Sequence, residues 1–171
     1  MNRCGNLLTA AAAAICDAHA SAIAERAGLN PSVTATILTL GQHDAQSLSQ
    51  IAVVSGITHS AMVRLIAGLE RRGLVTRGAG RDRREAAISL SEAGRELYAT
   101  LRQLQAQVMA PLVDSLTAEQ RAVLEAVLAD ILTRLTTGRE TADHICRFCD
   151  EEVCGQDLCP VELQACRLTQ A

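Results

Sequence analysis

The chain has 171 residues, which is enough for one domain with a single hydrophobic core plus an appendage. All 16 basic residues are arginine, and Phe148 and Tyr98 are the only large aromatic residues, so the core must be built from Leu, Ile, Val and Ala, a composition that favours helices. The formal net charge of −3 argues against a nucleic-acid binder for the chain as a whole, but charge acts locally on the face that meets a partner. Residues 58–84 carry seven arginines against two acids, whereas residues 138–171 carry seven acids against three arginines.

A membrane protein and a secreted disulfide-rich protein are not expected. The longest apolar run near the start, residues 7–15, falls short of the roughly 20 residues that a membrane span needs. The same stretch continues as an amphipathic pattern through Asp17, His19 and Glu25 and has no clean signal-peptide cleavage site. We therefore expect a cytoplasmic protein whose seven cysteines stay reduced or bind metal.

Two helices are predicted at the start of the chain. The first covers residues 6–27 and ends at Gly28. The second covers residues 31–41, because Asn30-Pro31 suits the opening of a helix and proline is favoured at a first helical position.

A helix-turn-helix is predicted next. Ser47 is placed to cap a short helix, residues 55–57 form a turn around a glycine, and Thr58 is placed to cap a second helix. This second helix has four apolar residues on one side, Met62, Val63, Ile66 and Leu69.

Two strands and two long helices follow. Residues 74–77 and 86–90 are predicted to be strands joined by a charged hairpin tip. A long helix is expected over residues 91–115, and Thr117 with Gln120 forms a capping box for the last long helix, which Gly138 follows.

The hairpin tip contains Asp82-Arg83-Arg84 and is followed by Ser89-Leu90-Ser91-x-x-Gly94. These residues match a D-x-R wing signature and the start of a long dimer helix. A resemblance to the MarR family of winged-helix regulators extends over the run SLSQIAVVSGITHSAMVRLIAGLERRGLVTRGAGRDRREAAISLSEAGREL. The resemblance covers about residues 6–137. It implies a mainly α winged helix-turn-helix with a two-stranded β-wing and long N- and C-terminal dimerisation helices. Residues 1–137 would be the DNA-binding and dimerisation domain, and residues 138–171 a Cys-rich metal or cluster-binding tail outside the usual family pattern.

The positions of the arginines agree with this resemblance on physical grounds. A helix in the major groove needs short polar or guanidinium side chains near its N-terminus, and a narrow minor groove attracts a guanidinium on the wing. The expected DNA-binding residues are Thr58, His59, Ser60, Arg64, Arg77, Arg81, Arg83 and Arg84. By resemblance, Arg84 is the minor-groove finger and Asp82 stabilises the wing. The alternatives are a solvated charge run and, for His59, an exposed residue without a base contact.

The resemblance also implies a homodimer, because the first and last helices of family members interlock. Apolar residues at helical spacing supply a surface for this, at Leu112, Leu116, Val123, Leu124, Val127, Leu128, Ile131 and Leu135. A two-fold dimer implies double-stranded operator DNA with a pseudo-palindromic sequence.

Four cysteines crowd the tail at C-x2-C-x4-C-x4-C, namely Cys146, Cys149, Cys154 and Cys159, with a proline after the last. An iron–sulfur cluster is favoured, because clusters accept one C-x2-C pair with more widely spaced thiolates and a Cys-Pro ending recurs among them; the tail partly resembles the cluster loop of SoxR-type regulators. The spacing does not distinguish [2Fe-2S] from [4Fe-4S]. Structural zinc is the alternative, weakened because only one C-x2-C knuckle exists, and a reversible thiol switch is third.

The remaining thiols and one histidine have several interpretations. His144 could replace a thiolate or be solvated near a helix end. Cys166 could be a fifth ligand, a resolving thiol or a small buried hydrophobe, and Cys16 and Cys4 are expected to be structural.

The sequence thus predicts a dimeric repressor whose operator binding responds to a Cys-coordinated metal or iron–sulfur centre. The alternative is a regulator of the same family that responds to a small aromatic ligand, with the tail as a zinc-braced C-terminus. An enzyme is not expected, because no general base is placed by sequence near Cys146 and Cys149.

Overall fold

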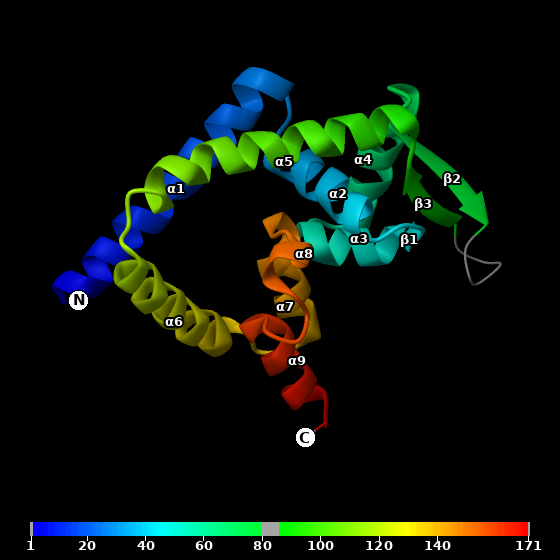
Figure 1. The fold of residues 1–171 in the computed structure, drawn as a ribbon. Helices are drawn as coiled ribbons and strands as arrows, with labels where there is room; N and C mark the ends of the chain where they lie inside the picture. Colours follow the sequence, from blue (N-terminus) through cyan, green and yellow to red (C-terminus); the bar gives the residue numbers. More distant parts are fainter. Residues whose placement is uncertain (1, 80–85, 171) are drawn as a thin grey trace.

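The computed structural model describes residues 2–79 and 86–170 and is mainly helical (Figure 1). Its elements are, in chain order, α1 (Arg3–Ala27), α2 (Pro31–Gln42), β1 (Gln46–Ser47), α3 (Leu48–Ser55), α4 (His59–Arg71), β2 (Val75–Ala79), β3 (Ala86–Leu90), α5 (Glu92–Val113), α6 (Ala118–Leu135), α7 (Arg139–Ile145), the 3-10 helix η1 (Cys146–Phe148), α8 (Glu151–Cys154) and α9 (Pro160–Gln170). The predicted winged helix-turn-helix is confirmed, with a third strand that the sequence patterns did not indicate.

The helix boundaries follow from local capping chemistry. Gly28 ends α1 in the left-handed conformation, and the Asn30 side chain accepts the N–H of Val33 at the start of α2. Thr117 and Gln120 form the predicted capping box that begins α6.

Helices α3 and α4 meet at 105° and form the helix-turn-helix. Ser47 caps α3 in a capping box with Gln50, and the Thr58 hydroxyl accepts the N–H of Ala61 at 3.2 Å to begin α4. Gly56 ends α3 with φ +67, a left-handed conformation that glycine adopts without strain.

The small sheet is antiparallel with strand order β1-β3-β2. The unpredicted strand β1 pairs with the middle of β3, Gln46 opposite Ile88. Ser91 joins the sheet to α5, because its hydroxyl donates to the Gly73 carbonyl at 2.6 Å and accepts the N–H of Gly94 at 3.0 Å. Gly94 is buried against the Leu74 carbonyl, and a Cβ there would collide with that oxygen. Packing of the start of α5 against the sheet therefore explains both the serine and the glycine of the S-x-x-G motif.

One hydrophobic core lies between α2, α3, α4, the sheet and the start of α5. Its largest fully buried apolar side chains are Ile37, Leu38, Ile51, Met62, Ile66, Leu69, Ile88 and Leu101. Each buried aliphatic side chain of this size contributes about 1.5–3 kcal/mol relative to exposure. This core fixes the helix-turn-helix against the first turns of α5.

Helices α1, α5 and α6 extend away from that core as an arm (Figure 1). None of the residues of α6 is buried, and large apolar side chains on it are exposed, Val123 by 64% and Val127 by 50%. In α1, Leu7 and Leu8 are exposed as well. No membrane span was expected from the sequence. By length and mean hydropathy alone, however, α1 is compatible with one.

The tail folds back on the rest of the chain instead of trailing from it. Helix α7 packs across α3, η1 packs against α2, and α9 packs against both α6 and α7 (Figure 1). Ala142, Val161 and Ala165 form a small second core between these helices. The described tail contains three α-helices and η1. The division at residue 137 remains a prediction.

Candidate functional site

The N-terminal turns of α4 present polar side chains to solvent. His59, Ser60 and Arg64 are exposed, while the apolar Met62 and Ile66 of the same helix are buried in the core. This division follows from the helical period, which puts residues three and four apart on one side. The exposed set has the composition and position that a major-groove reader needs.

Two of the predicted DNA-binding residues have structural partners. The Thr58 hydroxyl is engaged as the cap of α4 and lies 3.2 Å from the Ser60 hydroxyl. Arg77 on β2 donates from Nε to the Glu70 carboxylate at 2.9 Å, so it braces the wing against α4. The wing residues Arg81, Asp82, Arg83 and Arg84 lie outside the described residues.

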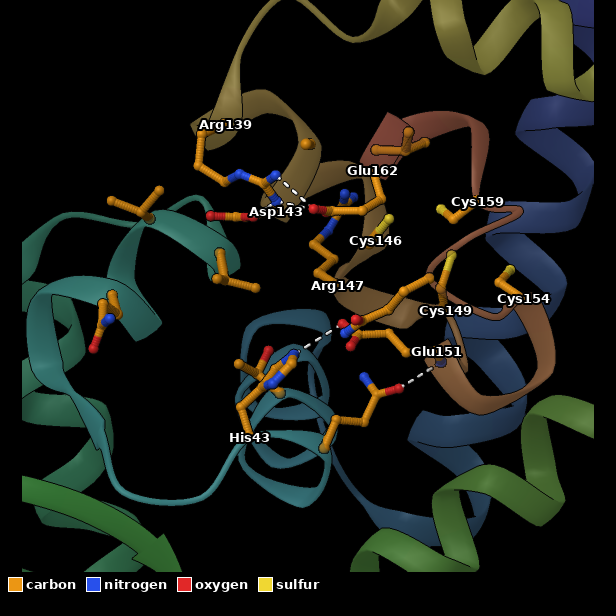
Figure 2. Close-up of a pocket in the computed structure, with 18 of the residues that line it drawn as sticks. His43, Arg139, Asp143, Cys146, Arg147, Cys149, Glu151, Cys154, Cys159 and Glu162 are labelled. Carbon is orange, nitrogen blue, oxygen red and sulfur yellow. Dashed lines mark hydrogen bonds and ion pairs between the residues drawn. The ribbon is translucent and has the colours of Figure 1, made fainter. Parts of the chain in front are cut away.

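A cavity of about 530 Å³ separates the helix-turn-helix from the tail (Figure 2). One wall comes from α2 and α3 and includes Gln42, Gln50 and Val53. The opposite wall comes from the tail and includes all four clustered cysteines, Cys146, Cys149, Cys154 and Cys159. The predicted thiol cluster therefore lies beside the helix-turn-helix.

The backbone brings Cys146 and Cys149 close together. They are the first and fourth residues of a tight turn in which the Cys149 N–H donates to the Cys146 carbonyl at 2.8 Å. The neighbouring Cys146 thiol, together with the guanidinium groups of Arg102 and Arg147, lowers the pKa of Cys149 to about 7 despite its burial. The neighbouring Cys149 thiol and burial raise the pKa of Cys146. Cys149 is therefore the more acidic thiol of the two.

Cys154 and Cys159 lie on the same side of the cavity without completing a ligand shell. Figure 2 shows their thiols facing the same region as the thiol of Cys149. Burial raises the pKa of Cys154, and the nearby thiol groups of Cys149 and Cys159 add to this. Within residues 2–79 and 86–170, no three His, Cys, Asp or Glu side chains converge closely enough to hold a metal ion.

The thiol turn is fastened to the long helix α5. Arg102 donates to the carbonyls of Phe148 and Cys149 at 3.2 and 2.7 Å, and Gln105 donates to the Phe148 carbonyl at 2.9 Å. The Phe148 ring packs against the main core and meets His19 of α1 edge-on at 5.5 Å. Burial lowers the pKa of His19. A single aromatic residue between the two cysteines thus ties the thiol turn to three helices.

Hydrogen bonds and an ion pair close the rim of the cavity (Figure 2). His43 at the end of α2 lies 2.8 Å from the Glu151 carboxylate, and the Glu151 N–H donates to the Gln42 side chain at 2.8 Å. On the other side, Arg139 binds the Glu162 carboxylate through two hydrogen bonds of 2.7 and 2.8 Å, which lower the pKa of Glu162. These contacts hold α8 and α9 in place around the thiols.

The remaining cysteines and His144 are placed differently from one another. Cys4 and Cys16, which were expected to be structural, are exposed on α1. Cys166 is also exposed and hydrogen-bonds Glu162 at 3.2 Å, so for Cys166 the alternative of a small buried hydrophobe does not hold. His144 is half-buried, and its Nδ1 is 2.9 Å from the Val54 carbonyl of α3. Its imidazole binds the end of α3, a contact that sequence patterns did not reveal.

Comparisons with known proteins agree with this fold. Residues 27–85 match the model of the MarR family, and no curated protein matches the chain. The transcriptional regulator PA3341 is 28% identical and covers 77% of this chain and 96% of its own, with a TM-score of 0.62.

Two other similar structures contain a bound partner. The Mycobacterium tuberculosis MarR family protein Rv2887 in complex with DNA is 21% identical, with a TM-score of 0.62 over 77% of this chain and 98% of its own. CouR from Rhodococcus jostii RHA1, bound to p-coumaroyl-CoA, is 22% identical, with a TM-score of 0.61 over 76% of this chain and 92% of its own. At these identities the likeness concerns the fold.

Proposed function

Because the chain carries a MarR family domain in a winged helix-turn-helix fold, we propose that it is a cytoplasmic, homodimeric transcriptional repressor and not an enzyme. The observation that carries this proposal is the exposed N-terminal part of α4, with His59, Ser60 and Arg64 opposite the buried face of the same helix. The likeness to Rv2887, whose structure contains DNA, supports the same use of the fold. Double-stranded DNA is therefore the proposed partner.

Binding-site selection tests whether α4 reads bases. Arg64→Ala should bind the operator more weakly and should lose preference at one or two base pairs, because a side chain over a base edge carries sequence information. Arg167→Ala, which removes an exposed arginine from α9, is the matched control and should leave the selected sequence unchanged. Identical selected sequences for the parent and Arg64→Ala would refute this assignment.

The arm of the molecule supports the dimer. Helix α6 buries none of its residues within the single chain, and it exposes Leu124 and Leu128 as well as Val123 and Val127. Exposed apolar surface of this extent normally marks an interface. A second copy that covers α6 and the exposed leucines of α1 would remove this surface from water. Burial in such a dimer would also explain why α1 is apolar, so no membrane span is needed.

We further propose that operator binding responds to a centre held by Cys146, Cys149, Cys154 and Cys159. All four line one cavity wall, the first two lie at the ends of one tight turn, and the opposite wall belongs to α2 and α3. Thiolates of this kind bind iron–sulfur clusters or zinc. An iron–sulfur cluster is the favoured occupant and zinc the alternative, and either requires Cys154 and Cys159 to approach the first pair.

Anaerobic purification followed by metal analysis identifies the occupant. Iron and sulfide with visible absorbance would support a cluster, whereas a colourless protein with one zinc per chain would support a zinc site. Protein that contains neither metal, and that fails to take up iron or zinc on reconstitution, would overturn the proposed centre while leaving the DNA-binding proposal intact.

A second candidate function is a response to a small aromatic ligand, with the tail as a brace. The cavity volume of about 530 Å³ favours it, since small-molecule sites commonly measure about 300–1,000 Å³. CouR, bound to p-coumaroyl-CoA, has a similar fold. Titration of the operator complex with aromatic acids separates the candidates. The titration uses a variant in which all four clustered cysteines are serine. Release of the DNA by an acid in this variant would favour the ligand and exclude the centre.

A further inference from the structure

The tail supplies a hydrogen bond that the helix-turn-helix lacks. At the C-terminus of α3 the Gly56 N–H donates to the Ala52 and Val53 carbonyls, and the Ile57 N–H donates to the Ala52 carbonyl. The last carbonyls of a helix have no partner within it. The Val54 carbonyl finds its partner 90 residues away, in the imidazole Nδ1 of His144 at 2.9 Å. Since a carbonyl only accepts, Nδ1 carries the proton and donates.

The His144 ring also lies against the turn itself. A Cβ on Gly56 would approach the ring carbon Cε1 to 2.5 Å and Nδ1 to 3.0 Å. Gly56 is therefore required both for its φ of +67 and for the space that the imidazole occupies. The turn that sets the direction of α4 is held by a side chain from α7.

The backbone around His144 is fixed at several points. Its carbonyl accepts from Arg147 Nη1 at 2.6 Å, and Cys146, two residues later, begins the thiol turn. Beyond Cys146, Phe148 packs in the main core and Arg102 of α5 holds the Phe148 and Cys149 carbonyls. The imidazole thus connects a firmly anchored segment to the turn between α3 and α4.

We propose that His144 is a positioning residue for DNA reading, which caps α3 and sets the orientation of α4 through Val54 and Gly56. This proposal rests on the proposed function, in which α4 reads DNA. It assigns to the tail a direct structural role in the reading unit, independent of whether the thiols hold a metal. His144 lies two residues before Cys146, so its bond to Val54 also joins the segment of the thiol turn to the helix-turn-helix.

Three variants test the proposal in the full-length protein. His144→Ala removes both contacts. His144→Asn retains an N–H donor at about the distance of Nδ1 from the backbone, so it can restore the bond to Val54. His43→Ala is the matched control, because the imidazole of His43 pairs with Glu151 of the tail and not with the turn.

Two measurements are made on each variant: operator affinity, and hydrogen exchange of the amides around Gly56 and Ile57. His144→Ala should weaken operator binding about threefold to tenfold, the range expected for one lost hydrogen bond, and should speed exchange at the turn. His144→Asn should recover most of both losses, and His43→Ala should resemble the parent. Unchanged exchange and affinity in His144→Ala would overturn the proposal, as would an equal loss in His144→Asn.

The variants distinguish the reading role of α4 from the positioning role of His144. If the parent protein does not bind DNA, or if Arg64→Ala binds as well as the parent, the reading role of α4 fails whatever His144 does. If Arg64→Ala is impaired but His144→Ala is not, α4 reads DNA and His144 does not position it.

Discussion

Arg102 on the long helix α5 donates a 2.7 Å hydrogen bond to the carbonyl of Cys149, so the backbone of the thiol turn is fixed by the helix that also forms the arm. The side chain of Arg102 is only 15% exposed and lies over the Tyr98 ring at 5.2 Å. A mostly buried guanidinium that holds two backbone carbonyls is costly to remove, because the carbonyls lose their partner in a place that water reaches poorly.

We predict that Arg102→Ala lowers the free energy of unfolding by about 1–3 kcal/mol, the cost of leaving buried acceptors unsatisfied. Urea denaturation measures this. Gln107→Ala is the control, since Gln107 accepts only an exposed hydrogen bond from Arg26. Equal midpoints for Arg102→Ala and the parent would show that α5 does not support the thiol turn.

The wing provides a second prediction. Arg84→Ala should weaken operator binding by about 1–3 kcal/mol, the range for one good specific contact, because it removes the guanidinium assigned to the minor groove. The dimer should stay intact. Fluorescence anisotropy at physiological salt measures the affinity and sedimentation measures the dimer, and an unchanged affinity would exclude Arg84 from the interface.

Charge placed on the exposed face of α6 should dissociate the dimer. Leu128→Asp puts a carboxylate where we expect a second copy to pack, and burial of an unpaired charge is strongly unfavourable. Sedimentation velocity should show monomers, together with weaker operator binding. Arg134→Glu changes charge at a polar position of the same helix and should have a smaller effect. A dimeric Leu128→Asp would place the interface elsewhere.

Alkylation rates test the assignment of charge within the thiol pair. In metal-free protein, Cys149 should react as a thiolate with a half-maximal rate near pH 7, because the neighbouring Cys146 thiol and nearby guanidinium groups lower its pKa to about 7. The rate should rise with pH, since the thiolate is the nucleophile. In Cys146→Ala the pKa of Cys149 should increase, which shifts the profile to higher pH. A profile that does not move would show that Cys146 does not lower the pKa of Cys149.

Local chemistry made most of the fold predictable, and long-range packing accounts for what was not. Ser47, Thr58 and Thr117 cap their helices where the sequence placed them, because capping involves residues only three positions apart. Strand β1 was not predicted, because two residues carry no alternation and their pairing with β3 lies some forty residues away.

The candidate site was predictable in composition and not in arrangement. The spacing of the four cysteines indicated a cluster, and they do line one cavity. Their position against α2 and α3 depends on Phe148, Arg102 and His144, which act across the fold and leave no periodic pattern. The only phenylalanine, set between the first two of these cysteines, was a signal that this segment is anchored in the core and not a mobile tail.

DNA binding should depend on the state of the cysteine centre. The most direct measurement is the operator affinity of one metal-loaded preparation before and after chelation, with metal content determined on the same samples. Chelation of the parent should change the affinity, Cys149→Ser and Cys159→Ser should each contain no metal and show no response, and Cys4→Ser should behave as the parent. Parent protein that binds the operator with the same affinity when loaded and when chelated would contradict the claim and leave the tail as a brace.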